Sequence, residues 1–269
     1  MSSTPTDSHT REPNGRRPAR RPAPVWLTVP VSLLALVGLW AAIARFLQPD
    51  LLPAPDRVLV LAIEEWRRGA LVFHVGMTLA RVTAAFFIAM GVGTAIGIAL
   101  GLSRRADRAF DPWLVVALNV PALVTIILCY LWFGLTEAAA VAAVAINKIP
   151  NVAVTLREGT RALDRDLMEM AAVYRFGKLG TLRHVILPQL APFFAASARS
   201  GIALIWKIVL VVELLGRSNG VGFQIHLYFQ LFDIARIFVY AIAFILVMQG
   251  VELAILQPWE RRANRWRAA

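Results

Sequence analysis

Six long hydrophobic stretches dominate the sequence. They lie at residues 25–47, 75–102, 113–133, 138–155, 190–212 and 237–256. Each is close to the roughly 20 residues that an α-helix needs to cross the hydrocarbon core of a membrane. The pattern predicts an all-α, polytopic membrane protein with about six transmembrane helices. Residues 25–47 form the first of these helices, and residues 70–258 form a core with the other five.

The fourth hydrophobic stretch is interrupted by polar residues and a proline. Asn147 and Lys148 lie near its middle, and Pro150 follows them. Proline removes one hydrogen bond from a helix, and a backbone group freed at membrane depth must be covered by protein or water. We therefore expect this helix to bend, with the bend facing the protein interior.

One polar segment, residues 165–192, stands between two hydrophobic stretches. Apolar residues of its first half recur at i, i+3, i+4 and i+7: Leu167, Met170, Ala171 and Tyr174. The same spacing continues in its second half at Leu179, Leu182 and Ile186. This periodicity predicts two short amphipathic helices, with a turn near Gly177 and Gly180. Such a helical pair suits docking to a partner, but it is equally compatible with a basic connection lying on the membrane surface.

The distribution of charge indicates which side of the membrane each connection between the spans occupies. The chain has a net charge of +11, a hydrophobic fraction of 58% and a mean hydropathy of +0.62. Of the Lys and Arg residues that lie between and beyond the spans, 18 fall on the side that holds both termini and the 165–192 segment, and 4 fall on the other side. Positive residues gather on the cytoplasmic side of membrane proteins. We therefore expect both termini and the 165–192 segment in the cytoplasm.

The two ends of the chain are basic. Residues 1–24 are rich in Ser, Thr, Pro and Arg without periodicity, which predicts a disordered cytoplasmic arm, and residues 259–269 form a basic tail. The stretch at 25–47 is longer than a signal-peptide core, so we expect it to remain as a membrane anchor. The arginines flank apolar spans instead of alternating with exposed aromatic residues, which argues against nucleic-acid binding.

Small residues recur along the second stretch at every fourth position: Ala85, Ala89, Gly93, Gly97 and Gly101. Such a stripe lets another helix approach closely. Packing within the chain is the favoured interpretation, and a subunit interface is the alternative.

The sequence offers little catalytic chemistry. The single cysteine, Cys129, excludes an intrachain disulfide and has no cluster of metal ligands around it. No phosphate-binding G-x-x-x-x-G-K-[ST] motif occurs, so we expect ATP and Mg²⁺ to bind elsewhere than in this chain. Residues 216–220 satisfy G-x-S-x-G around Ser218, with His226 nearby. A serine nucleophile needs a preceding strand, whereas a hydrophobic span precedes this one, so an external turn is favoured over an intramembrane serine hydrolase.

Motifs along most of the chain resemble those of a known family. The string EMAAVYRFGKLGTLRHVILP, from Glu169 to Pro188, resembles the EAA loop of binding-protein-dependent ABC importer permeases. Further motif-like residues narrow the resemblance to the nitrate, sulfonate and taurine permeases: LLPAPDRV at 51–58, Thr78, Arg81, Asn119, Pro121, LWFG at 131–134, Glu137, Trp206, Glu213, Gly220 and Gly222.

The resemblance implies a type I ABC importer permease fold in the inner membrane and a transport subunit rather than an enzyme. It also implies a second permease copy, two ATPase subunits that hold ATP and Mg²⁺, and an external substrate-binding protein. The residues expected to couple to the ATPase are Glu169, Ala171, Ala172, Tyr174, Gly177, Leu187 and Pro188. The implied cargo is a small anion such as a sulfonate, taurine or nitrate. A self-sufficient secondary transporter or channel remains the alternative.

The chain departs from the family pattern at three positions. Arg175 replaces the glycine of the EAA motif, so we expect the turn at Gly177 instead. Lys148 and Lys207 replace apolar residues inside spans, where charges usually face partners or a polar path. Candidate residues for a translocation path are Lys148, Lys207, Thr125 and Asn147. Internal pairing, for instance of Lys207 with Glu213 or Glu252, is the alternative.

Overall fold

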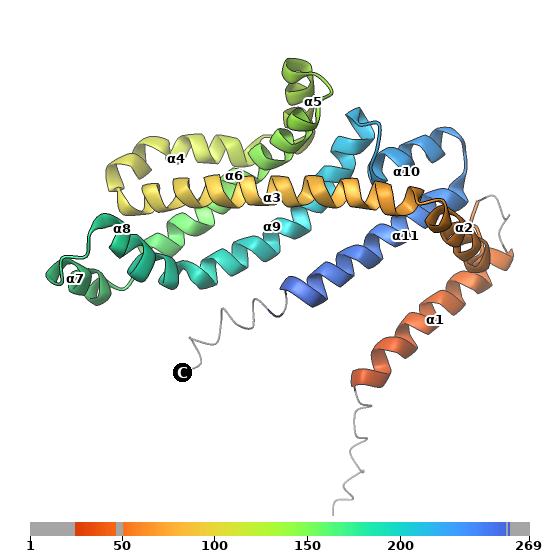
Figure 1. Cartoon of the computed structure of the whole chain (residues 1–269), viewed down its shortest axis with the longest axis horizontal. Helices are drawn as coiled ribbons and strands as arrows, with labels where there is room; N and C mark the ends of the chain where they lie inside the picture. Colours follow the sequence, from red (N-terminus) through yellow and green to blue (C-terminus); the bar gives the residue numbers. More distant parts are fainter. Residues whose placement is uncertain (1–24, 47–50, 257, 259–269) are drawn as a thin grey trace, which may run out of the picture.

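The computed structural model describes residues 25–46, 51–256 and 258, and the regular structure in these ranges is entirely helical (Figure 1). The helices are α1 (Val25–Phe46), α2 (Pro55–Arg67), α3 (Ala70–Leu102), α4 (Arg104–Asn119), α5 (Ala122–Phe133), α6 (Glu137–Arg161), α7 (Arg165–Val173), α8 (Lys178–Thr181), α9 (Leu187–Gly216), α10 (Val221–Gln230) and α11 (Ile234–Val251), with π-helical turns η1 (Leu182–Ile186) and η2 (Glu252–Leu256). The predicted arm, 1–24, and tail, 259–269, lie outside the described residues.

Among the described residues, three helices are long and apolar enough to cross a membrane. They are α3, α6 and the helix Ile234–Ala254, and the bent pair of α4 and α5 raises the number to four. Helix α1 has nearly the bounds predicted for the first span, and its residues Val31–Phe46 form a shorter apolar helix. Helix α9 contains the fifth predicted span and carries three charged residues. The count of six spans therefore stays a prediction.

The third predicted span, 113–133, is not one straight helix. Helix α4 ends at Asn119, Val120 and Pro121 are extended, and α5 begins at Ala122. The two helices are bent by 94° from each other, and α5 stands away from α4 in Figure 1. The span prediction did not include this break, which arises because Pro121 disfavours helical geometry at the residue before it and offers no N–H of its own. That the bent pair forms one span stays a prediction.

Helix α6 continues through Pro150, which is buried, and the bend expected there stays a prediction. The short helices depart from the prediction. The N-terminal half of α4 lies outside the predicted spans, and it is helical with the Ser103 hydroxyl capping it by accepting the N–H of Ala106. Helices α2 and α10 were not predicted, since neither is long enough to register as a hydrophobic span.

Helices α3 and α6 pack at very short range along the stripe of small residues. A Cβ atom added to Gly93 would lie 2.6 Å from the Val152 Cβ atom, and one added to Gly97 would lie 2.6 Å from the Ala153 carbonyl oxygen. One added to Gly101 would lie 2.4 Å from the Thr160 Cβ atom. The stripe thus serves packing within the chain, as predicted.

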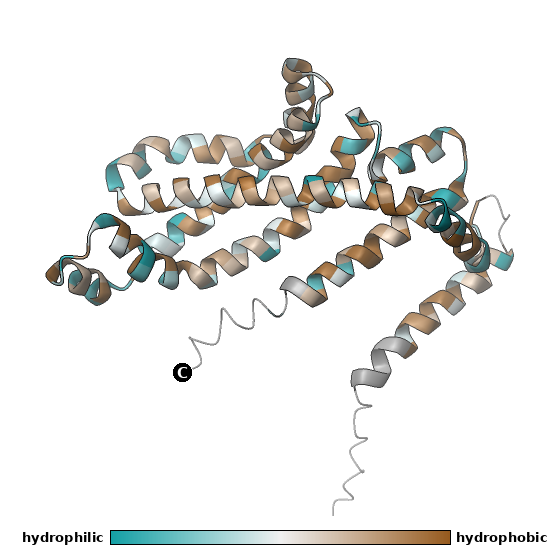
Figure 2. Cartoon of the chain, in the orientation of Figure 1, coloured by the Kyte–Doolittle hydropathy of each residue, from teal (hydrophilic) through white to brown (hydrophobic). Residues whose placement is uncertain are grey.

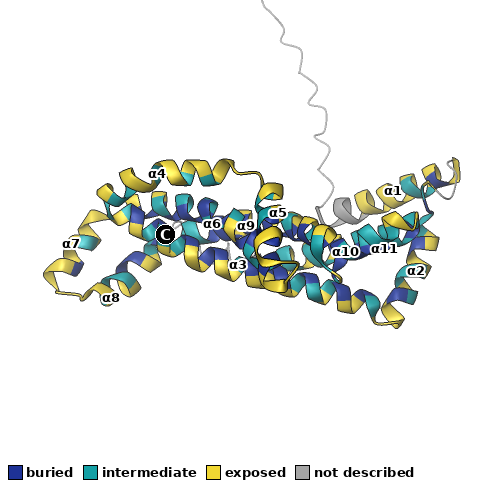
Figure 3. Cartoon of the chain, turned by 90° about the horizontal axis from the view of Figure 1, so that it is seen from above, coloured by how far each residue is buried: buried dark blue, intermediate teal, exposed yellow. Residues whose placement is uncertain are grey.

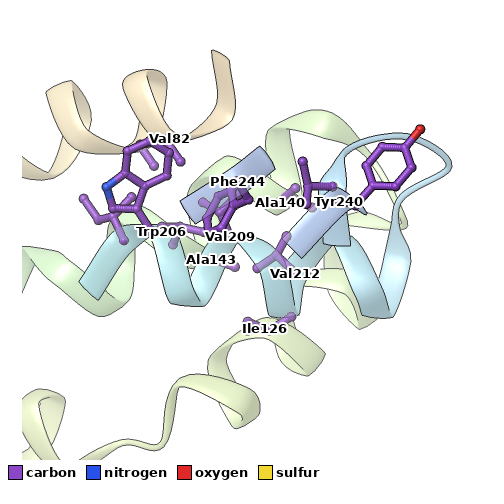
Figure 4. Packing of buried hydrophobic residues seen from close by; sticks show 14 of the residues in the cluster. Val82, Ile126, Ala140, Ala143, Trp206, Val209, Val212, Tyr240 and Phe244 are labelled. Carbon is purple, nitrogen blue, oxygen red and sulfur yellow. The ribbon is translucent and has the colours of Figure 1, made fainter. Parts of the chain in front are cut away.

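Two apolar clusters hold the bundle together. The larger one joins α3, α5, α6, α9 and α11 (Figure 4), and its members include Val82, Ile126, Ala140, Ala143, Trp206, Val209, Val212, Tyr240 and Phe244. The smaller cluster lies toward the 165–192 segment: Met90, Val152, Leu156, Ile186, Leu190 and Ala198. Apolar residues also face outward on α1, α3 and α11 (Figure 2), as expected of helices in lipid.

Candidate functional site

The 165–192 segment forms a helical projection at one end of the bundle (Figures 1 and 3). Helix α7 forms as its apolar periodicity predicts, and Asp164 caps it by accepting the N–H of Asp166 at 2.8 Å. The second predicted helix is present as α8, but it continues through η1 into α9. The segment is therefore built into the start of a long core helix.

The chain turns after α7 at Arg175, whose φ of 52° lies in the left-handed region. The Phe176 N–H donates to the Ala171 carbonyl at 2.9 Å, and the Arg175 N–H donates to the Ala172 carbonyl at 3.1 Å. These two bonds define a Schellman motif, in which glycine is the usual left-handed residue. The predicted shift of the turn to Gly177 is wrong, because Gly177 has a φ of −62° and only precedes α8.

Most of the residues predicted to couple to a partner lie on the surface. Glu169, Ala172, Tyr174, Gly177, Leu187 and Pro188 are exposed. Ala171 differs, since it is only 1% exposed and therefore packs inward. Val173, Tyr174 and Leu179 are more than 70% exposed, so the tip of the segment presents an apolar surface (Figure 3). Exposed apolar side chains grouped in this way are typical of interaction sites.

Direct contacts join the segment to the bundle. Met168 of α7 and Leu182 of η1 pack against the smaller apolar cluster. The Asp164 N–H also donates to the Gln189 side-chain oxygen at 2.8 Å, which ties the start of α7 to α9. The segment is therefore in direct contact with α9 and with the apolar cluster to which α6 contributes.

A buried polar network lies toward the opposite end of these helices. Arg81 of α3 donates to Glu213 of α9 at 2.6 Å and, through two nitrogens, to Glu137 of α6 at 2.7 and 2.8 Å. Arg81 also bonds the Asn219 backbone and side chain, and Arg217 bonds Glu137. Glu213 is fully buried, and Arg81 is 4% exposed. We call these five residues the Arg81 network.

The buried carboxylate of Glu213 is satisfied by several donors. The Thr78 hydroxyl donates to it at 3.0 Å and the Gly222 N–H at 2.8 Å. Gly220 crosses directly over it with a φ of 108°, and an added Cβ atom would lie 2.3 Å from the Glu213 carboxyl carbon. The position thus requires glycine. The network fastens the α9–α10 connection to α3.

The sequence analysis identified most members of the Arg81 network one by one, as members of motifs, but it did not predict that they contact one another. Arg81 and Glu213 are 132 positions apart, so no local spacing could reveal the pair. The signal available was the need of each charge inside an apolar span for a partner.

The four predicted path residues do not form one cluster. Lys148 of α6 is 3% exposed, and its side chain lies over Gly201 of α9. Lys207 is exposed on α9, whereas Thr125 and Asn147 are half-buried on α5 and α6. No hydrogen bond or ion pair in the described part of the chain joins any two of these side chains.

The internal pairing considered for Lys207 does not occur. Glu213 is paired with Arg81, and Glu252 lies 3.7 Å from Arg199. In the described ranges, neither Lys148 nor Lys207 forms an ion pair.

The serine motif forms a turn. Ser218 is exposed and follows helix α9, not a strand. His226 is bonded to Gln230 at 3.0 Å, and no hydrogen bond of the described residues joins it to Ser218. The arrangement lacks the paired base that activates a nucleophilic serine.

Comparison with known proteins points in one direction. Residues 89–255 match the family described as binding-protein-dependent transport system inner membrane component. The chain is 28% identical over 234 residues to the protein named aliphatic sulfonates transport permease protein SsuC in Bacillus subtilis, covering 86% of this chain and 84% of the relative. It is 26% identical over 268 residues to the taurine transport system permease protein TauC of Escherichia coli, covering 96% and 95%.

A solved structure agrees on the fold. The crystal structure of an amino acid ABC transporter with histidines aligns with a TM-score of 0.58 at 23% identity, covering 75% of this chain and 97% of that chain. The likeness shows a common helical architecture.

Proposed function

Because this chain belongs to the family of binding-protein-dependent transport system inner membrane components, we propose that it carries a small sulfonate-like anion across the membrane as one half of a homodimer. The chain is a transmembrane permease subunit of an ABC importer, a transport subunit and not an enzyme. Its family works with an ATPase subunit and a substrate-binding protein.

The observation that carries the choice of cargo is the burial of Lys148 without an ion pair in the described residues. A charge inside a membrane span is costly, on the order of 2.5 to 3.5 kcal/mol on insertion scales, and such groups tend to face a partner or a polar path. Two relatives are named for the transport of aliphatic sulfonates and of taurine, and taurine is itself a sulfonate. Lys148 and Lys207 would attract an anion of this kind at separate points of the path, with Thr125 and Asn147 as neutral polar groups elsewhere along it.

This assignment is tested by uptake. Lys148→Leu or Lys207→Leu should lower the uptake of radiolabelled taurine and of an alkanesulfonate in cells that contain the whole transporter, while membrane abundance stays unchanged. Lys148→Arg is the matched control, since it keeps the charge. Normal uptake by both leucine variants would remove these lysines from the path.

For energy coupling, we propose that the 165–192 segment docks on the ATPase at the cytoplasmic side, where the excess of Lys and Arg would place it together with both termini. ATP and Mg²⁺ would bind to the ATPase and not to this chain. The exposed tip at Val173, Tyr174 and Leu179 supports docking, and the packing of Met168 and Leu182 supplies a route from the tip into the bundle. Nucleotide-driven closure of the ATPase dimer would then rock the helices and open the path alternately to each side.

Glu169 is the residue on which to test this docking. It is exposed on α7, where a reversed charge leaves the fold of the bundle intact. Glu169→Lys should abolish co-purification with the ATPase or uncouple ATP hydrolysis from transport in reconstituted vesicles. Asp56→Lys, on exposed α2, reverses a charge far from the segment and serves as control. An unchanged ratio of ATP hydrolysed to solute transported would contradict the docking role.

A further inference from the structure

An apolar groove of 590 Å³ opens between α3, α4 and α6. Its lining is formed almost entirely by hydrocarbon side chains, among them Ile96, Ala99, Phe110, Trp113, Ile146 and Pro150. The walls come from two helices that are apolar enough to span a membrane and from α4, none of whose residues is buried. A groove lined in this way has the chemistry to hold a hydrocarbon chain.

A second cavity, of 700 Å³, begins where the groove ends, since Leu100 lines both. It lies at the last residues of α3 and α6 and at the first residues of α4 and α7. Its polar lining is mostly arginine: Arg104, Asp107, Arg108, Arg161 and Arg165. We call it the arginine cavity.

The positive charge of the arginine cavity is only partly neutralised. Asp107 is bound by Arg157 at 3.2 Å and also by Arg161. Arg104, Arg108 and Arg165 form no ion pair with any residue in the described ranges. Three cations thus converge on a cavity that opens beside an apolar groove.

We propose that the groove and the arginine cavity together bind an anionic phospholipid, with the phosphate in the cavity and an acyl chain in the groove. Basic pockets between transmembrane helices bind anionic headgroups, and each arginine near the surface contributes about a fivefold gain in affinity. A zwitterionic headgroup brings a cation of its own beside the phosphate, so it would leave the positive charge of the cavity in excess, whereas an anionic headgroup neutralises it. A soluble phosphate compound would leave the groove unused, so the occupant that matches both features is a lipid.

The lipid would join parts of the protein that few other contacts connect. Arg104 and Arg108 belong to α4, whereas Arg165 is the first residue of α7 and Met168 of α7 lines the same cavity. Its headgroup would hold the 165–192 segment against the C-terminal end of α3 and the N-terminal end of α4 (Figure 1). This inference goes beyond solute transport and holds whichever solute is carried.

The test uses the full-length permease with its ATPase, purified in a neutral detergent and stripped of lipid. Binding of palmitoyl-oleoyl phosphatidylglycerol and of the matching phosphatidylcholine is measured by native mass spectrometry. We expect the anionic lipid to bind at least tenfold more tightly. The triple variant Arg104→Gln, Arg108→Gln, Arg165→Gln should bind it on the order of 100-fold more weakly. Arg57→Gln is the control. Arg57 is exposed on α2, which precedes the end of α3 far from the cavity, so this variant should leave lipid binding unchanged.

Two further measurements separate a lipid from other occupants. Ala99→Trp fills the groove and leaves the arginines intact, so it should weaken phosphatidylglycerol binding about tenfold, and glycerol phosphate at millimolar concentration should not displace the lipid. Equal binding of the two lipids, full binding by the triple variant, or displacement by glycerol phosphate would overturn the proposal. Loss of the ATPase from the triple variant together with normal phosphatidylglycerol binding would mean that the three arginines contact the ATPase and not a lipid, which would also overturn the proposal.

Discussion

Removing the carboxylate of Glu213 should strongly destabilise the permease. Glu213 is fully buried, and its loss leaves Arg81, which is 4% exposed, without one of its two anionic partners. Removing one partner of a buried ion pair typically costs 3 to 5 kcal/mol. Arg81 keeps Glu137 and Asn219, so the lower end, about 3 kcal/mol, is expected for Glu213→Ala. At roughly 2 to 4 °C per kcal/mol for a chain of this size, Tm should fall by about 6 to 12 °C.

The assay is thermal unfolding of the purified permease in detergent, followed by tryptophan fluorescence. Glu137→Ala is the matched control, because it removes a carboxylate from the same arginine but from a side chain that is 46% exposed. Water can replace an exposed carboxylate as a partner of Arg81, so we expect a cost near the roughly 1 kcal/mol of exposed pairs, and Tm should fall by only about 2 to 4 °C. The reasoning is refuted if Glu137→Ala lowers Tm as much as Glu213→Ala does, since burial would then not determine the cost.

Two further predictions concern the backbone. Arg175→Gly should stabilise the turn after α7 by about 1 kcal/mol, because glycine adopts a positive φ without strain. Slower amide exchange in the 165–192 segment would report this gain. Arg175→Ala removes the same charge without relieving the strain and should give no such gain. Gly97→Ala should cost at least about 2 kcal/mol, because the new methyl group would lie 2.6 Å from a backbone oxygen of α6, whereas Gly91→Ala on the same helix meets nothing within 4 Å and should leave Tm unchanged or higher. Equal Tm values for the two alanine variants would contradict the close packing of α3 on α6.

Local patterns predicted the parts of the structure that depend on local spacing. The apolar period gave α7, and the small residues at every fourth position gave the contact of α3 with α6. The break at Pro121 was missed because a hydropathy average runs across a proline in an apolar stretch, although the backbone cannot remain helical there. The turn at Arg175 was assigned wrongly because the prediction relied on the preference of glycine for a positive φ, whereas α7 ends at Val173 and Arg175 takes the left-handed position.

The Arg81 network escaped prediction for a different reason. Its members come from α3, α6, α9 and the α9–α10 connection, and only the folded bundle brings them together. The sequence indicated that each charge needs a partner but could not say which one. Lys207 illustrates this limit, since the two glutamates considered as its partners, Glu213 and Glu252, lie against Arg81 and Arg199.

The positions of the 165–192 segment and the Arg81 network indicate that α3, α6 and α9 would carry a movement along the bundle as one rigid body and not by local bending. The segment is packed onto one end of α6 and α9, and the network joins α3, α6 and α9 toward the other end. Between them, Gly93 and Gly97 bring α3 against α6 with no room for one more methyl group. Packed interiors of this density transmit displacement instead of absorbing it. A movement imposed on α7 should therefore reach the α9–α10 connection as a rotation of the three helices together.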